Sequence, residues 1–449
     1  MKRLLFLVLL IATAAFAIDR QPNADYRARR EALAKKAGGS PILVFAASES
    51  DVTEKLTGFR QDENFYYLTG VNEPGAAVLI APALDEEAVK NLHAQLPPGR
   101  PATLKVRPYS EVLFLPQRNR AAERWTGPQL GPDDPQVRSE TGFERVLPLD
   151  ALRDALATLL PPLGGVVLVN QGADAKLALD WLKRSNLPFY ARDAKPLIAS
   201  LRMVKDAGEM ALIRKATDGS VAAHLAAMKA MKPGMTERQI AALMQYEYER
   251  RGCERPAYAP IVGAGFNSTV LHYDADSGPI NDGDVVVMDV AGEYSGYASD
   301  ITRTLPATGH FTPRQREIYG IVLGAQQAVS AAFKAGKSAL TGDNPDSLQK
   351  AAYDYINTHG ADLHGRPLGQ YFIHGIGHHV GLDVHDPSEP GKPLDKGMVF
   401  TIEPGIYIPE EKLGVRIEDI FWVDPSGHLV RLSDPLPRTA EDVEKMMAK

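Results

Sequence analysis

The sequence predicts two successive domains, an α/β domain followed by a mixed α+β domain. Apolar runs of strand character alternate with helical periods in the first half, whereas long helices and blocks of strands follow one another in the second half. A length of 449 residues also exceeds that of one typical domain. We therefore expect domains over residues 18–196 and 197–449, with the junction near Ala194–Met203.

The composition is that of an ordinary globular protein. Hydrophobic residues make up 44% of the chain and charged residues 24%, which is enough to form sizeable cores. The formal net charge is −6 and no basic stripe occurs, so we expect no nucleic-acid partner. Cys253 is the single cysteine, which excludes a disulfide within the chain. Its neighbours carry no thiol-enzyme signature, so we expect an inert, structural residue.

The first 17 residues have the pattern of a secretory signal peptide. Lys2 and Arg3 precede an apolar run over residues 4–11, and Ala15-Phe16-Ala17 has the A-x-A form of a cleavage site. The apolar run is short for a membrane span. We therefore expect removal of residues 1–17, export to the periplasm or out of the cell, and no stable membrane span afterwards. An uncleaved N-terminal anchor is the alternative.

In the first domain, hydrophobic periodicity and turn composition predict alternating helices and strands. Helical periods cover residues 25–37 and 149–160, and residues 72–75 have turn composition. Residues 96–106 are Pro-rich and residues 127–139 resemble a loop. Strands are expected over residues 41–46, 65–69, 76–80, 112–115 and 166–169.

The second domain repeats a helix-then-strand order, which indicates an internal duplication. Thr236 can cap a helix with Gln239 in the capping-box position. Helices are expected over residues 205–231, 236–251, 313–335 and 346–359, and strands over residues 260–304 and 398–423.

Two aspartates accompany strand-forming runs in this domain. Asp289 lies in the run 285–290, and Asp300 lies in the run 297–304. If a hairpin turn is centred on Tyr294-Ser295, the two carboxylates face each other directly. Opposed like charges destabilise a sheet unless a cation compensates them. The spacing therefore indicates a metal site. A slipped register that leaves one aspartate in solvent is the alternative.

A glycine-interleaved histidine block follows. His374, His378, His379 and His385 are four of the eleven histidines and fall within twelve residues. Histidine is the commonest metal-binding and proton-transferring side chain, and glycines permit close backbone approach. The block therefore indicates a site. His379 is its weakest member and could pack or face solvent instead.

Two glutamates complete the candidate set. Glu403 follows the strand run 398–402, and Glu418 lies in an apolar segment where a buried, unpaired carboxylate is costly. Arg416 offers Glu418 an ion pair as the alternative to ligation. Oxygen-rich ligation with one imidazole suits manganese, cobalt, iron or zinc, and this many carboxylates fit two ions.

Taken together, these motifs resemble the pita-bread metallopeptidases, above all the Xaa-Pro aminopeptidases (aminopeptidase P), with the prolidases next. Residues 58–75 are similar to the N-terminal domain of that family, so the resemblance covers most of the chain. The catalytic motifs that carry it are Asn267–Tyr273, Asp289, Asp300, the block 374–385, Thr401–Gly405 and Arg416–Asp419.

The resemblance implies a pita-bread catalytic domain with an internal pseudo-twofold axis behind an aminopeptidase-P-like α/β domain. It implies two divalent metal ions, for which we expect Mn²⁺, with Co²⁺, Zn²⁺ and Fe²⁺ as alternatives. Glu403 would also serve as general base, and Asp300 and Glu418 would bridge the ions. The metal ligands would be Asp289, Asp300, His378, Glu403 and Glu418, and the substrate-site histidines would be His272, His374 and His385.

The implied activity is removal of the N-terminal residue before proline from peptides by metal-activated water. The resemblance also suggests a homodimer or homotetramer. A prolidase-type dipeptidase shares the same site and remains open. A non-catalytic binding protein and a metal-free creatinase-type hydrolase are disfavoured because no ligand is missing. A methionine aminopeptidase is disfavoured by the large N-terminal domain. Short segments between residues 386 and 403 and between residues 408 and 415 leave substrate length open.

Overall fold

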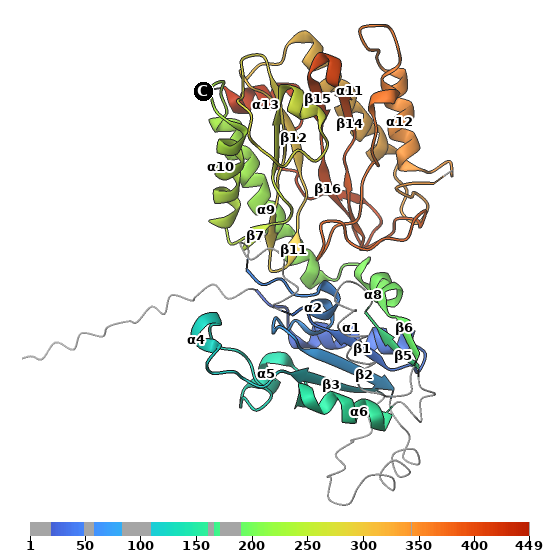
Figure 1. Ribbon diagram of the computed structural model, residues 1–449. Coiled ribbons are helices and arrows are strands. Elements are labelled where there is room, and N and C mark those ends of the chain that lie inside the picture. The colour runs from blue at the N-terminus through green and yellow to red at the C-terminus, as the bar shows by residue number, and fades with distance from the viewer. Residues whose placement is uncertain are drawn as a thin grey trace, which may run out of the picture.

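A computed structural model describes residues 19–48, 58–82, 109–159, 166–170, 190–342 and 344–448. The expected leader at residues 1–17 and the Pro-rich stretch at residues 96–106 lie outside these ranges. The N-terminal sheet and its helices form one body, and the C-terminal helices and strands form the other (Figure 1). The fold class predicted from the motifs, α/β followed by α+β, is confirmed. No helix in the described part of the chain has the length and apolarity needed to cross a bilayer.

The N-terminal body is built on a six-stranded mixed sheet in the order β4-β3-β2-β1-β5-β6. Alternate residues of β1 and β2 enter two separate apolar cores, so both faces of the sheet are covered. The strands are β1 (Ile42–Phe45), β2 (Ala77–Pro82), β3 (Tyr109–Leu115), β4 (Val146–Pro148), β5 (Val166–Val169) and β6 (Tyr190–Asp193), and the helices are α1 (Asn23–Lys36), α2 (Glu63–Thr69), α4 (Glu123–Thr126), α5 (Val137–Thr141), the 3₁₀ turn η2 (Leu149–Ala151) and α6 (Leu152–Leu159).

Residues 65–69 were expected as a strand, and that prediction is wrong because they belong to helix α2. The Asp62 side chain accepts a hydrogen bond from the Phe65 N–H at 2.7 Å, which caps the start of the helix. Gly70 takes the left-handed conformation with φ 60° and closes its end. Phe65 and Leu68 then bury the same face. Caps at both ends outweigh the strand preference of the aromatic residues.

The C-terminal body contains two helix pairs, α9 with α10 and α11 with α12 (Figure 1). Capping boxes start three of these helices, and the predicted Thr236–Gln239 box is confirmed. Helix α8 (Lys195–Arg202) leads into this body from the N-terminal one and packs against α1 and α2. The helices of the C-terminal body are α9 (Ala207–Ala230), α10 (Glu237–Glu249), α11 (Pro313–Ala332), α12 (Leu348–Thr358) and α13 (Ala440–Met447), with 3₁₀ turns η4 (Gly265–Thr269), η5 (Leu368–Tyr371) and η6 (Pro409–Glu411).

Each helix pair is followed in sequence by its own small antiparallel sheet, as the expected duplication requires. These sheets have the orders β12-β9-β8 and β13-β16-β17, and an isolated bridge between Thr302 and Glu418 joins the two halves. The strands are β7 (Arg255–Pro256), β8 (Ile261–Ala264), β9 (Val285–Asp289), β10 (Gly292–Tyr294), β11 (Tyr297–Ala298), β12 (Thr302–Pro306), β13 (Val399–Ile402), β14 (Gly405–Ile408), β15 (Leu413–Arg416), β16 (Asp419–Val423) and β17 (Leu429–Arg431).

The predicted hairpin register is wrong by two residues. Tyr294 pairs with Tyr297, so the turn is centred on Ser295-Gly296, and Asp289 pairs with Thr302 rather than Asp300. Ser295 and Gly296 have φ values of 51° and 81°, as a two-residue type I′ turn requires. Asp300 therefore lies just before β12, outside the ladder.

Candidate metallopeptidase active site

All eight predicted site residues line one cavity of about 520 Å³ in the C-terminal body. The two halves of the domain contribute to it from the ends of their strands. The predicted residues are Asp289 at the end of β9, Asp300 before β12, Glu403 after β13, Glu418 before β16, and the loop histidines His272, His374, His378 and His385.

The two aspartates converge even though they do not pair in the sheet. The Tyr258 hydroxyl lies 2.6 Å from Oδ1 of Asp289 and 2.6 Å from Oδ1 of Asp300. Tyr258 was not predicted, because a lone tyrosine before Ala259-Pro260 has no metal-site signature. Burial raises the pKa of Asp300, and the negative charge of Asp289 also raises it, whereas the hydrogen bond from His378 opposes the shift. A cation between these carboxylates would offset that cost.

Arg416 does not form the predicted alternative ion pair with Glu418. Its Nη2 lies 2.7 Å from Oδ2 of Asp289, and its Nη1 donates to the Tyr407 hydroxyl at 2.9 Å. Glu418 instead accepts a hydrogen bond from Thr302 Oγ1 at 2.6 Å. Burial raises the pKa of Glu418, and repulsion by neighbouring carboxylates adds to the shift. Glu418 is thus a buried carboxylate whose charge requires a further partner.

His378 presents Nε2 to the carboxylates. That atom lies 3.2 Å from Oδ2 of Asp300 and 3.5 Å from Oε1 of Glu403, while Nδ1 faces the His379 carbonyl at 3.1 Å. Burial lowers the pKa of His378, but the contacts with Asp300 and Glu403 outweigh it and raise the pKa to about 9. One ligand atom each from Asp300, His378 and Glu418 lie within 4.8 Å of one another. This arrangement fits a shared cation.

Glu403 is held by its own strand. Thr401 Oγ1 donates to Oε1 of Glu403 at 3.0 Å and accepts the His378 backbone N–H at 3.1 Å. Burial raises the pKa of Glu403 to about 7. A carboxylate that titrates near neutrality suits a general base. Thr401 thus connects this glutamate to the histidine block, a role that its place in the motif 401–405 did not reveal.

His374 lies near Oε2 of Glu403, whereas His378 lies near Oε1. Nδ1 of His374 is 3.8 Å from Oε2 of Glu403 and 2.8 Å from the Gly375 carbonyl, and its Nε2 is 2.9 Å from the Tyr407 hydroxyl. Burial lowers the pKa of His374 to about 4, and the Arg416 charge adds to that effect. His374 is therefore a neutral imidazole at neutral pH, whose Nδ1–H is donated to the Gly375 carbonyl and whose Nε2 accepts from the Tyr407 hydroxyl.

The remaining histidines differ in position. The His385 ring lies 4.0 Å from the His378 ring, centroid to centroid, and is exposed on its other side. His272 is exposed at the cavity edge. His379 is buried behind the site and does not line the cavity, so of the two alternatives left open for it, packing holds and exposure to solvent does not. Cys253 is also buried, and burial raises its pKa to about 12, so it is no nucleophile.

The donor set fits hard or borderline divalent cations. It combines four carboxylates with one imidazole in a buried pocket, and three of those carboxylates have raised pKa values. Oxygen-rich ligation of this kind excludes soft, thiol-preferring metals from the expected set.

Comparison with known proteins agrees with this geometry. Residues 211–425 match the model of metallopeptidase family M24, and residues 26–167 match the aminopeptidase P N-terminal domain. The chain is 33% identical to Xaa-Pro aminopeptidase of Escherichia coli (strain K12), over 96% of this chain and 98% of that protein. It is 30% identical to human Xaa-Pro aminopeptidase 3, over 87% and 77% of the two chains.

Solved structures give the same result. Aminopeptidase P from Escherichia coli with the inhibitor Pro-Leu has a TM-score of 0.80 at 30% identity, covering 96% of this chain and 99% of that one. A putative aminopeptidase P from Bacillus anthracis has a TM-score of 0.81 at 25% identity, covering 95% and 98%. The family expected from the motifs is confirmed, and the protein is a metallo-aminopeptidase. The chain belongs to the aminopeptidase P family of M24 metallopeptidases.

Proposed function

We propose that this enzyme hydrolyses the N-terminal Xaa-Pro bond of peptides with two divalent cations held in the cavity. The observation that carries the proposal is the convergence of Asp289, Asp300, His378, Glu403 and Glu418 on one buried pocket. The names of the relatives, Xaa-Pro aminopeptidases from bacteria and mammals, support the substrate class. Of the metals that the donor set fits, we propose Mn²⁺ as the native one.

The chemistry divides between the cations and the chain. Bound cations would polarise the scissile carbonyl and lower the pKa of a water molecule. Glu403 would accept the proton of the attacking water and return it to the departing nitrogen. His374 is neutral and lines the cavity, with its ring aligned by Nδ1–H donation to the Gly375 carbonyl and by the Tyr407 hydroxyl at Nε2, so it would border the substrate as a fixed polar wall. His272 and His385 contact the substrate at the cavity wall.

A proline after the scissile bond is compatible with a site that polarises the carbonyl with cations and transfers protons through side chains. Its tertiary amide nitrogen has no N–H, and its ring fixes φ. A peptidase that recognises the N–H of the scissile amide therefore handles this bond poorly. A site that recognises the carbonyl and delivers a proton to nitrogen does not need that N–H. Hydrolysis forms the C–O bond, breaks the C–N bond and leaves the proton on the proline nitrogen.

The substrate test uses metal-depleted protein reconstituted with Mn²⁺. We expect release of the first residue from Xaa-Pro-Yaa-Zaa peptides and no release when alanine replaces proline. Asp300→Ala is expected to abolish release, and the exposed Asp282→Ala is the matched control with wild-type rates. Equal rates for Asp300→Ala and wild type would contradict the site. Cleavage of Xaa-Pro dipeptides alone would indicate a prolidase-type dipeptidase instead.

We also propose export and self-association. The N-terminal pattern supports cleavage after Ala17, so the mature protein is expected to begin at Ile18 and to fractionate outside the cytoplasm. N-terminal sequencing of the protein from its native host tests this. An intact Met1 in the cytoplasmic fraction would contradict it. Sedimentation of the purified protein tests the dimer or tetramer implied by the family.

A further inference from the structure

Two fully buried side chains lie behind the cavity, one from each helix pair. His224 projects from α9 and Gln326 projects from α11, and neither lines the cavity. Each hydrogen-bonds to backbone carbonyl groups next to the proposed carboxylate ligands. Burying a polar group is costly unless it finds partners, so these partners show what each side chain is for.

His224 spans the two aspartate segments. Its Nε2 lies 3.0 Å from the Val290 carbonyl oxygen and 3.1 Å from the Ile301 carbonyl oxygen. Both partners can only accept, so Nε2 carries the hydrogen and donates it to both. Val290 directly follows Asp289, and Ile301 directly follows Asp300. One imidazole therefore joins the two backbone segments that present the aspartates, in addition to the direct hydrogen bond from the Val290 N–H to the Ile301 carbonyl at 3.3 Å.

Gln326 does the same in the second half. Its Nε2 lies 3.0 Å from the Ile402 carbonyl oxygen and 3.3 Å from the Ile417 carbonyl oxygen. Ile402 directly precedes Glu403, and Ile417 directly precedes Glu418. A single amide nitrogen thus spans the two segments that present the glutamates. The two helix side chains have equivalent roles in the two halves of the duplicated domain.

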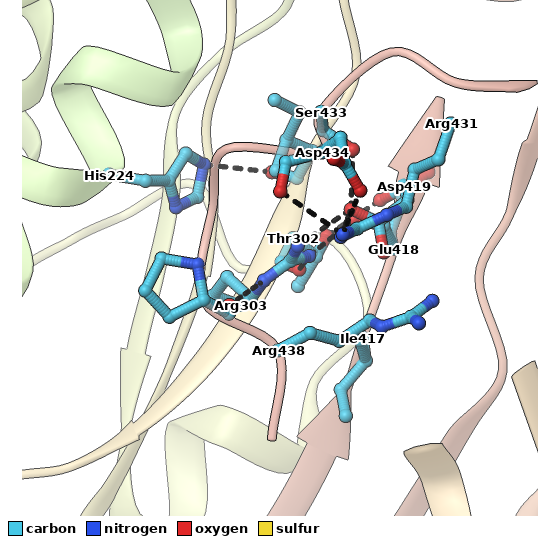
Figure 2. Close-up of polar contacts among 12 residues, drawn as sticks. His224, Thr302, Arg303, Ile417, Glu418, Asp419, Arg431, Ser433, Asp434 and Arg438 are labelled. Carbon is cyan, nitrogen blue, oxygen red and sulfur yellow. Dashed lines mark hydrogen bonds and ion pairs between the residues drawn. The ribbon is translucent and has the colours of Figure 1, made fainter. Parts of the chain in front are cut away.

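The Gln326 contact continues into a buried ion pair between Arg303 and Asp419, and Figure 2 labels these two residues. Gln326 Nε2 also donates to Oδ2 of Asp419 at 3.0 Å, and Arg303 Nη2 donates to Oδ1 of Asp419 at 2.6 Å. Arg303 Nη1 donates to the Glu418 carbonyl at 2.7 Å and to the Thr302 carbonyl at 2.9 Å. This network holds the backbone of Glu418 from the side opposite the cavity.

We propose that His224 and Gln326 are paired positioning residues that set the spacing of the four carboxylate ligands. The inference rests on the metal ligands assigned above. Metal affinity requires ligand distances within about 0.2 Å of their ideal values, and residues that orient ligands change it strongly. Each side chain here sets the distance between two ligand-bearing segments rather than the orientation of one ligand. If these residues served only the general stability of the core, their loss would affect unfolding but not metal affinity.

The test is Mn²⁺ affinity, measured by chelator competition on metal-depleted protein. His224→Leu and Gln326→Met remove the donors, and each is expected to weaken Mn²⁺ binding about 10- to 100-fold. His224→Gln restores an N–H donor of the kind that Gln326 supplies, so its affinity is expected to stay within about threefold of wild type. His224→Asn, whose amide is too short to reach, is expected to behave like His224→Leu. If His224→Leu does not fold, comparing the Mn²⁺ affinities of His224→Asn and His224→Gln tests the same point.

Ile318→Val on α11 and Ile213→Val on α9 are the matched controls, because both side chains are fully buried on the same two helices but are apolar and form no hydrogen bond to a ligand-bearing segment. They are expected to lower the unfolding midpoint but leave Mn²⁺ affinity unchanged. Wild-type Mn²⁺ affinity in the donor-free variants would overturn the inference, as would an equal loss in the isoleucine controls. Failure of the wild-type protein itself to bind Mn²⁺ would instead overturn the proposed function.

Discussion

Arg202 and Asp386 form an ion pair that is almost completely shielded from solvent, with 2.6 Å between Nη2 and Oδ1 and side-chain exposures of 3% and 1%. Arg202 ends α8 and also donates through Nη1 to Asn64 of α2 at 2.9 Å. Asp386 directly follows His385 and accepts from Lys205 at 2.7 Å. The N-terminal body is therefore connected through Arg202 to the loop that carries His385, a proposed substrate-site histidine.

We expect Arg202→Met to destabilise the protein by about 3–5 kcal/mol, because it leaves the Asp386 carboxylate buried with one partner fewer. The loop with His385 should also shift, so kcat/KM for an Xaa-Pro-Yaa peptide should fall. Urea unfolding and steady-state kinetics measure both effects. Arg250→Met removes a half-exposed ion pair with Glu247 and is the control, with an expected cost of no more than about 0.5 kcal/mol. Equal costs for the two variants would contradict the account of the buried pair.

Gly377→Ala should be far more damaging than Gly375→Ala in the same loop. A Cβ at Gly377 would lie 2.1 Å from the Thr401 carbonyl oxygen, a backbone atom that cannot move aside freely. We expect a loss of about 1–3 kcal/mol and displacement of His378, because overpacking shifts the backbone. A Cβ at Gly375 meets nothing within 4 Å. Activity and unfolding of both variants test this, and similar behaviour of the two would show that the close approach is unimportant.

Tyr258→Phe should weaken metal binding without unfolding the protein. The hydroxyl that contacts both Asp289 and Asp300 is lost, and residues that orient metal ligands typically change affinity by about 10- to 100-fold. Tyr319→Phe is the control, because that hydroxyl is buried too but donates to the Arg438 carbonyl. The control should lose stability only. Unchanged Mn²⁺ affinity in Tyr258→Phe would argue against a supporting role for the hydroxyl.

Stability should depend on pH through His224. Burial lowers its pKa to about 4, and the nearby Arg303 charge adds to the shift while Asp289 opposes it. In the unfolded chain the imidazole protonates near its ordinary pKa of about 6.5. Between these values the unfolded state binds more protons, so the free energy of unfolding falls as the pH falls from about 6.5 to about 4. The loss reaches about 3 kcal/mol at the lower limit.

His224→Gln lacks this titration and provides the comparison. The difference in unfolding free energy between wild type and His224→Gln should be constant above pH 7 and should shift in favour of the variant as the pH falls. Urea unfolding at several pH values in this range measures the difference. A difference that does not change with pH would mean that His224 keeps an ordinary pKa in the folded protein.

The site residues could be predicted where reactive side chains stand in a recognisable local sequence pattern. Asp289, Asp300 and Glu403 stand beside strong strand runs, and the glycine-interleaved histidines stand out against the composition, so the candidate site could be predicted. The hairpin register was missed although Gly296 carries a signal for it, because a type I′ turn needs positive φ at both central residues and Ser295-Gly296 meets this need better than Tyr294-Ser295.

Supporting residues were harder to predict. Tyr258, Thr401 and Gln326 act through contacts with residues distant in the chain, and each has an ordinary local sequence. Helix α2 was missed because Asp62 and Gly70 fix its ends, whereas the apolar and aromatic run between them resembles a strand. Long-range contacts and caps therefore account for most of what sequence patterns did not predict.

The most direct test of the central claim is the metal stoichiometry of the five-ligand site. Metal-depleted protein titrated with Mn²⁺ should bind two ions per chain, with Xaa-Pro hydrolysis appearing as the sites fill. Asp300→Ala, which removes a proposed bridging ligand, should lose both the binding and the activity. Hydrolysis by the metal-depleted protein, or full activity of Asp300→Ala without bound Mn²⁺, would contradict a dinuclear centre built by Asp289, Asp300, His378, Glu403 and Glu418.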